Sequence, residues 1–182
     1  WEQYCERNNF LSDCLKFQEV VRIPDYQLTF DKRSASRNGG VANIKPALGH
    51  VVEAVLFTTN EEGLKILRRK EGCPRVYEEQ ELIAIKSDGT EVSARVYVVP
   101  QSQSEGYVRP SRSYYEICKA GYASYGLCRL QLEKAANGEE PRPLSALFTY
   151  GTLLRGESRH EAINDAGMPD RNTQCALTGK VK

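Results

Sequence analysis

The sequence has few of the residues on which metal centres and strongly charged surfaces depend. It has two histidines, and its six cysteines form no Cys-x-x-Cys pair, which argues against a zinc site. Cysteines scattered in this way are typical of reduced thiols in a cytoplasmic protein. The formal net charge is +1, so no strong field favours nucleic acid or an anionic membrane as a partner. No apolar run approaches the roughly 18 residues that a membrane span needs.

What the 182 residues do carry is a succession of short strand patterns with few helices between them. Asp88-Gly89 between two alternating runs predicts a hairpin turn, and Asn60 and Ser111 precede helical segments as N-cap residues. The expected strands are 17–23, 26–30, 41–44, 50–58, 77–85 and 90–99, the expected helices 60–70, 111–120 and 125–136, and the expected polar loops 31–40 and 101–109. Sequential strands of this kind favour an α+β domain, a small and mostly antiparallel β-barrel with peripheral helices.

One stretch near the C-terminal end carries the strongest local motif. Residues 144–157 predict a short buried strand, a turn at Gly151 and the polar start of a helix. Unpaired backbone N–H groups at such a turn can form a small anion site. The string Phe148-Thr-Tyr-Gly-Thr-Leu153, followed by Arg155-Gly-Glu157, resembles the Tyr-Gly-x-Leu strand and loop of the gamma-glutamyl cyclotransferase superfamily, in its gamma-glutamylamine cyclotransferase branch.

The body of the chain, residues 17–130, resembles the gamma-glutamylcyclotransferases of the same superfamily. The resemblance rests on an ordered set of segments: Tyr26-Gln-Leu-Thr-Phe30, Gly39-Gly-Val-Ala-Asn-Ile44, the apolar strand 50–57, Lys70-Glu71-Gly72, the strand from Tyr77, Pro110-Ser111-x-x-Tyr114 and Gly121-x4-Gly126-Leu127. Two residues depart from the family pattern. Glu53 stands in the central strand where the family tends to carry Gly, and Cys128 follows Gly126-Leu127 where the family has Pro.

The family's opening strand is missing before residue 1, and its motif comes late in the chain. We therefore expect a cyclotransferase-like body over 1–136, a linker over 137–143 and a strand–loop–helix segment over 144–182. Three arrangements fit this order. The last segment could complete the same barrel as in a circular permutant, start a second domain of a tandem protein, or exchange with a neighbouring copy in a homodimer.

The resemblance implies an internal aminolysis as the reaction. The α-amine of a γ-glutamyl group attacks its own γ-carbonyl, 5-oxoproline forms, and an amino acid, amine or related conjugate leaves, with no metal or organic cofactor. A single carboxylate can serve as base and then as acid. The resemblance places this role on Glu71, before Gly72, whereas composition alone would make Glu71 a solvated helix-end acid beside Lys70.

The other expected site residues are less specific. The resemblance implies a substrate loop at Tyr150, Gly151, Thr152 and Leu153, which could equally be a strand-ending turn in an incomplete second domain. Tyr77 and Tyr114 are expected to line the pocket, although tyrosine also packs in strands and helices. A second interpretation stays open: a non-catalytic cyclotransferase-like binding or scaffold domain, or an incomplete fragment of a tandem protein, because Glu71 has no substrate to act on unless the loop reaches it.

Overall fold

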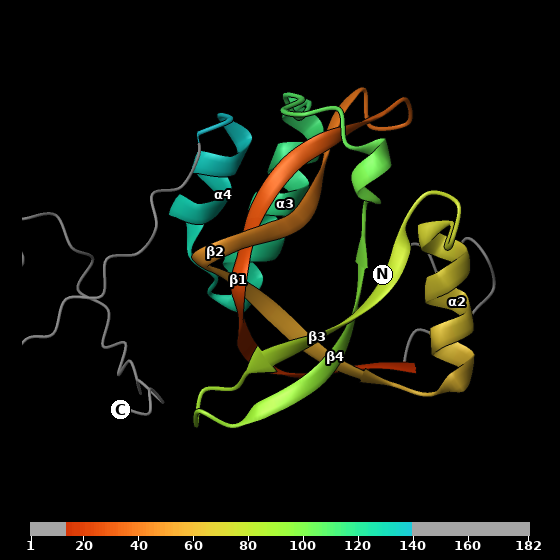
Figure 1. Ribbon diagram of the computed structural model, residues 1–182, viewed down its shortest axis with the longest axis vertical. Helices are drawn as coiled ribbons and strands as arrows, with labels where there is room; N and C mark the ends of the chain where they lie inside the picture. The colour runs from red at the N-terminus through yellow and green to blue at the C-terminus, as the bar shows by residue number, and fades with distance from the viewer. Residues whose placement is uncertain (1–13, 140–182) are drawn as a thin grey trace, which may run out of the picture. The chain divides into compact units, whose positions relative to one another are not determined.

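The computed structural model describes residues 14–139 and shows an antiparallel sheet with helices at its sides (Figure 1). The sheet has the order β2-β1-β3-β4. The described elements are β1 (Leu15–Ser34), β2 (Gly39–Thr59), α2 (Glu61–Glu71), β3 (Glu78–Ile85), β4 (Glu91–Val98), the short 3-10 helix η2 (Gln101–Gln103), α3 (Arg112–Tyr125) and α4 (Arg129–Ala136). The α+β class is confirmed. Within the described part of the chain the sheet stays open, so the expected closure into a barrel is not seen there.

Two long strands replace the four short ones expected before residue 60. β1 and β2 pair from Leu15↔Thr59 to Ser34↔Gly39, and the register shifts at three places instead of breaking. One shift lies at Pro24-Asp25, where Asp25 takes a φ of 58° and its carboxylate accepts a 2.8 Å bond from the Gly49 N–H. The prediction of a strand break there was wrong because Pro24 still pairs with Val51 and a bulge at Asp25 shifts the register without ending the strand. The predicted loop over 31–40 was also too long, because β1 continues to Ser34 and β2 starts at Gly39.

The hairpin predicted at Asp88-Gly89 is confirmed. β3 and β4 pair without a register shift from Glu78↔Val98 to Ile85↔Glu91. Gly89 has a φ of 86°, and the Asp88 carboxylate accepts a 2.9 Å bond from the Thr90 N–H. The local turn chemistry alone therefore sets the register of this hairpin.

The helices begin where their caps predicted, and one boundary differs. Asn60 caps α2, and Ser111 caps α3 by accepting a 3.4 Å bond from the Tyr114 N–H. α3 continues to Tyr125, and α4 starts only at Arg129. The break falls at Gly126, whose φ of 66° ends α3 in the left-handed conformation.

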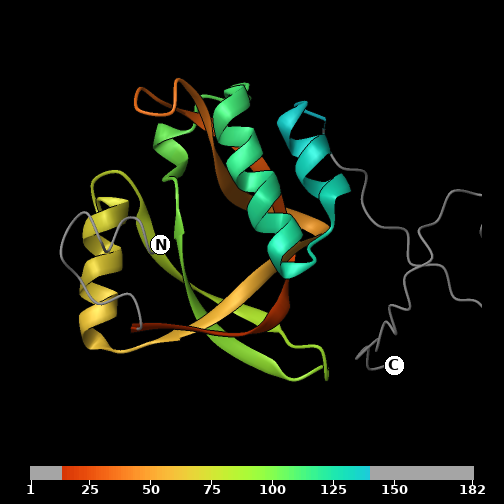
Figure 2. The ribbon, with the colours of Figure 1, turned by 180° about the vertical axis from the view of Figure 1, so that it is seen from behind.

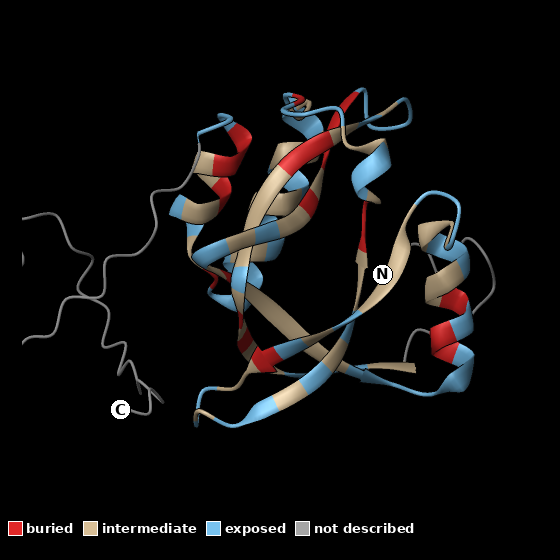
Figure 3. Ribbon diagram, in the orientation of Figure 1, coloured by how far each residue is buried: buried red, intermediate tan, exposed pale blue. Residues whose placement is uncertain are grey.

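The core consists of two clusters (Figure 3). Side chains from β1, β2 and β3 form the first, and Phe30 of β1 meets α4 in the second. Figure 2 shows α3 and α4 side by side against the β1–β2 hairpin. Four partly buried residues of α3 pack against the second cluster and so hold α3 to the sheet: Tyr114, Tyr115, Cys118 and Tyr122. The buried members are Val21, Ile23, Val52 and Ala84 in the first cluster and Phe30, Leu132, Ala135 and Ala136 in the second. None of the helices within 14–139 is long and apolar enough to cross a membrane.

Candidate functional site

The C-terminal end of α2 holds Glu71. Asn60 begins the helix by accepting a 2.8 Å bond from the Gly63 N–H. Gly72 ends it with a φ of 66°, and the N–H groups of Gly72 and Cys73 donate to the last carbonyls of the helix. Glu71 is thus the final helical residue, and its side chain is 23% exposed and in contact with the Lys70 ammonium.

A tight turn after α2 brings Tyr77 close to Glu71. The N–H groups of Arg75 and Val76 both donate to the Gly72 carbonyl at 2.9 Å, so the chain reverses within a few residues. Tyr77 is half-buried. Burial raises its pKa above the usual value near 10.0, the Glu71 carboxylate adds to the rise, and the Arg37 guanidinium opposes it. Tyr77 therefore keeps its proton at neutral pH and lies within electrostatic reach of Glu71.

Tyr114 joins this group from the first turn of α3. Its ring packs edge-on against Phe30 with centroids 6.4 Å apart, and its hydroxyl accepts a 3.4 Å bond from the Ala42 N–H. The Arg37 guanidinium carbon lies 5.2 Å from the centre of the Tyr114 ring. Burial is the main cause that raises the pKa of Tyr114, and Tyr77 contributes to the same rise. Electrostatic interactions thus link Glu71 to Tyr77, and Tyr77 to Tyr114 and Arg37.

An ion pair ties the end of α2 to the β3–β4 hairpin. Arg68 donates from Nε and Nη2 to the Glu79 carboxylate, both at 2.9 Å, and the Tyr97 hydroxyl donates to Glu79 at 3.1 Å. The bond from Arg68 is the main cause that lowers the pKa of Glu79. Burial and the bond to Glu79 raise the pKa of Tyr97 to about 12. These contacts fix the last turn of α2, and with it the position of Glu71.

Asp31 of β1 and Asn43 of β2 form a buried polar pair that sequence reasoning missed. Asn43 donates to both carboxylate oxygens of Asp31, at 3.0 and 3.2 Å, and its own carbonyl accepts a 2.9 Å bond from the Val99 N–H. Ser104 adds a bond of 3.2 Å to Asp31. Asn is uncommon inside strands, so Asn43 within an apolar strand pattern was the available signal. Arg37 had none, since it sits among other polar residues of a turn.

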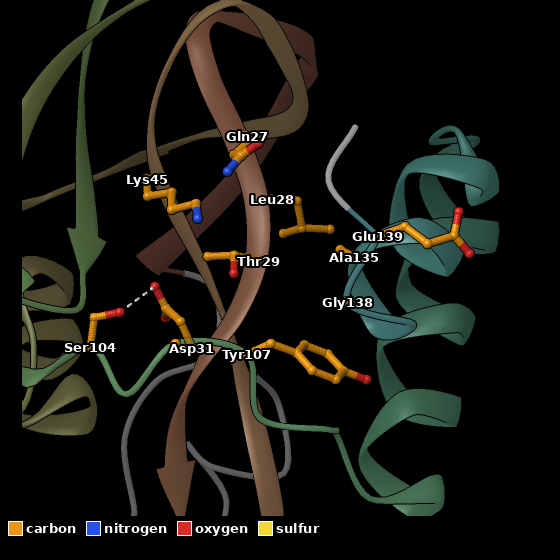
Figure 4. Close-up of a pocket in the computed structure, with 11 residues that line it drawn as sticks. Gln27, Leu28, Thr29, Asp31, Lys45, Ser104, Tyr107, Ala135, Gly138 and Glu139 are labelled. Carbon is orange, nitrogen blue, oxygen red and sulfur yellow. Dashed lines mark hydrogen bonds between the residues drawn. The ribbon is translucent and has the colours of Figure 1, made fainter. Parts of the chain in front are cut away.

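Asp31 also lines a cavity of about 240 Å³ (Figure 4). Its walls come from β1, β2, the 104–107 segment and the end of α4, and the Asp31–Ser104 bond closes one side. Glu71, Tyr77 and Tyr114 are not among its lining residues. The buried Asp31 carboxylate already accepts three hydrogen bonds, two from Asn43 and one from Ser104, so it has little capacity left for a ligand.

Comparisons with known proteins identify the family of the chain. A family model described as gamma-glutamyl cyclotransferase, AIG2-like, matches residues 3–116. The chain belongs to this family. A curated protein from Homo sapiens, gamma-glutamylcyclotransferase, is 28% identical over 141 residues, which span 75% of this chain and 73% of the relative.

Two solved structures of similar fold cover most of the chain. One is an uncharacterized protein from Homo sapiens, with a TM-score of 0.61 and 26% identity, covering 76% of this chain and 82% of that one. The other is a gamma-glutamyl cyclotransferase with a TM-score of 0.61 and 24% identity, covering 89% and 92%. The predicted family resemblance is therefore confirmed, and the second structure supports the fold alone.

Glu53, the departure from the cyclotransferase pattern, has a clear structural role. Its carboxylate accepts a 2.6 Å bond from the Cys128 N–H at the start of α4, where the Cys128 side chain provides no cap. Gln131 completes the contact by donating to the Val51 carbonyl at 2.7 Å. A carboxylate at a helix N-terminus is favourable, so Glu53 caps α4 from the neighbouring strand.

The predicted substrate loop is not part of the structure described here. Tyr150, Gly151, Thr152 and Leu153 lie outside the described residues, as does the whole segment 144–182. Within 14–139, no three His, Cys, Asp or Glu side chains gather in a way that could hold a metal ion.

Proposed function

We propose that this chain is a gamma-glutamyl cyclotransferase, which releases 5-oxoproline from a γ-glutamyl amino acid, amine or conjugate by intramolecular aminolysis. The observation that carries the proposal is Glu71, the final residue of α2, whose side chain is half-buried and whose charge contributes to the raised pKa of Tyr77. Membership of the family supports the same reaction class.

Glu71 is the proposed proton carrier. Its carboxylate takes a proton from the substrate's α-amine, the amine attacks the γ-carbonyl, and the protonated Glu71 then returns the proton to the leaving nitrogen. Tyr77 keeps its proton and can donate a hydrogen bond to Glu71 or to the bound substrate. Holding the flexible γ-glutamyl chain in its cyclising conformation supplies a large part of the rate.

The proposed role of residues 150–153 rests on their motif alone, because they lie outside the described residues. The family resemblance implies that their backbone N–H groups bind the carbonyl oxygen as it gains negative charge, or the α-carboxylate of the substrate. The Tyr-Gly-Thr-Leu motif supports this role, because Gly151 allows a close approach of the backbone to a ligand.

The test is 5-oxoproline release from a panel of γ-glutamyl amino acids and amines, with Glu71→Gln and a matched control. The amide keeps the size of Glu71 but cannot accept the proton, so we expect kcat to fall by about 10³-fold. Glu62→Gln removes an acid from the same helix whose side chain is 70% exposed, and it should leave kcat unchanged. An unchanged kcat in a folded Glu71→Gln variant would remove Glu71 from this role.

A second function stays open because of one contact. The Lys70 ammonium already engages the Glu71 carboxylate, as would suit a surface acid in a binding or scaffold domain. Titration calorimetry on the same γ-glutamyl panel separates the two functions. A binding domain would bind the compounds without releasing 5-oxoproline, whereas the enzyme would do both.

A further inference from the structure

Arg37 lies at the tip of the β1–β2 hairpin, and its backbone is anchored. The Ser111 hydroxyl donates a 2.6 Å bond to the Arg37 carbonyl, and the Gly40 N–H donates to the Arg109 carbonyl at 2.9 Å. Within the turn, the Asn38 N–H donates to the Ala35 carbonyl at 3.2 Å. The hairpin tip is therefore held against the start of α3, which fixes where the Arg37 side chain begins.

The Arg37 side chain is directed at the candidate site. Its guanidinium carbon lies 5.2 Å from the centre of the Tyr114 ring, and its charge partly opposes the rise that burial causes in the pKa of Tyr77 and of Cys118. Among residues 14–139, no carboxylate forms an ion pair with it. Within 14–139 its guanidinium makes this ring contact and no ion pair, so its N–H groups remain available to a carboxylate.

The residues of the candidate site differ in how far they are buried. Glu71, Tyr77 and Tyr114 are half-buried, whereas Arg37 is exposed. If the proton transfers take place at Glu71, as proposed above, the γ-glutamyl group lies beside the half-buried residues and its leaving group extends toward the exposed Arg37. In a γ-glutamyl amino acid, that leaving group carries a carboxylate of its own, and in a γ-glutamylamine it does not.

We propose that Arg37 binds the carboxylate of the leaving amino acid and so makes the site prefer γ-glutamyl amino acids to γ-glutamylamines. This inference rests on the proposed function. Two parallel N–H···O bonds from one guanidinium suit a carboxylate, and hydrogen bonds to a charged group of this kind correspond to about 10- to 100-fold in affinity.

The experiment compares two substrates that differ only in that carboxylate. The probes are γ-glutamyl-alanine and γ-glutamyl-ethylamine, with kcat and KM measured by 5-oxoproline release. The wild-type chain should prefer the alanine compound. Arg37→Gln should lower kcat/KM for the alanine compound by about 10- to 100-fold, mainly through KM, and change it less than about 3-fold for the ethylamine compound.

Two further variants separate recognition from folding and from general charge. Arg33→Gln removes an exposed charge from the same hairpin and should alter neither substrate. Arg37→Lys keeps the charge but loses the paired N–H edge, so it should restore part of the preference.

Each outcome decides one question. An equal loss of kcat/KM on both substrates, or an unchanged preference in an active Arg37→Gln variant, overturns the role of Arg37 and leaves the proposed function standing. No 5-oxoproline from either compound with the folded wild-type chain overturns the proposed function, and the role of Arg37 with it.

Discussion

The two hairpins of the sheet are built in different ways. β3–β4 is short and keeps one register along its length, and its turn is set by Asp88 and Gly89. β1–β2 is long, shifts register at three places, and presses its second strand against residues 108–111. The irregular hairpin carries Arg37 at its tip and the buried Asp31–Asn43 pair in its body.

The two hairpins differ in where their backbone hydrogen bonds go. Among the described residues, the β3–β4 hairpin pairs with β1 only at Ile85, opposite Arg22, so its turn can vary with little effect on the rest of the molecule. The β1–β2 hairpin instead exchanges backbone bonds with the segment before α3, since Val108 donates to Phe30 at 2.7 Å and Gly40 donates to Arg109 at 2.9 Å. Changes in this hairpin should therefore be felt at the candidate site, whereas changes at the Asp88-Gly89 turn of β3–β4 should not.

Gly40→Ala should give the largest effect. A Cβ at Gly40 would lie 1.9 Å from the Val108 carbonyl oxygen, which is backbone and has no rotamer to change. Strand β2 would move away from residues 108–111, and we expect a loss of about 3 kcal/mol in the free energy of unfolding, measured by urea denaturation.

Gly89→Ala is the matched change in the regular hairpin. Gly89 needs only its positive φ of 86°, so alanine there should cost about 1 kcal/mol. Equal losses in the two variants would show that close packing at Gly40 is not what distinguishes the hairpins.

Asn43→Ala should follow in size. The variant leaves the Val99 N–H without its acceptor and removes two of the three bonds to the buried Asp31 carboxylate. A loss of about 2 kcal/mol is expected from urea denaturation, because buried polar groups are left unpaired. Ser93→Ala removes a comparable cross-strand bond to Glu81 from β4, but at an exposed position, so it should change stability by less than about 0.5 kcal/mol. A neutral Asn43→Ala would mean that the buried pair contributes no net stability.

The same contrast explains what the sequence could predict. The β3–β4 hairpin, the α2 cap at Asn60 and the α3 cap at Ser111 depend on residues close in the chain, so their local patterns were sufficient. The continuity of β1 through Pro24-Asp25 depends on a bond from Gly49, which lies on the partner strand. No local pattern carries that information.

The candidate site also contains residues placed by local sequence and a residue placed by tertiary contacts. The role of Glu71 was inferred from its place before Gly72 in a family motif and stays a prediction, and the turn at 72–76 leads the chain back to Tyr77. Arg37 reaches the site only through its tertiary anchor on Ser111, so residue type and spacing gave no indication of it.

Glu79→Gln should have the smallest effect and a specific pH dependence. The folded-state pKa of Glu79 lies below its usual value near 4.5, chiefly because Arg68 bonds to the ionised form. The ionised pair therefore stabilises the fold above the unfolded-state pKa, and this stabilisation is lost as the pH falls through the folded-state pKa. At pH 7 the variant should melt about 2 °C below the wild-type chain, and the difference should shrink as the pH is lowered from about 5 to about 3.

Glu62→Gln is the control, because the Glu62–Lys65 pair is 3.9 Å long with both side chains 70% exposed, and it should leave the melting temperature unchanged at every pH. A Glu79→Gln difference that stays constant down to pH 3 would assign the effect to packing of the side chain instead of its charge. A difference that fades, together with a reduced kcat at pH 7, would indicate that the regular hairpin acts on the site only through the end of α2, where Arg68 and Glu71 lie one turn apart.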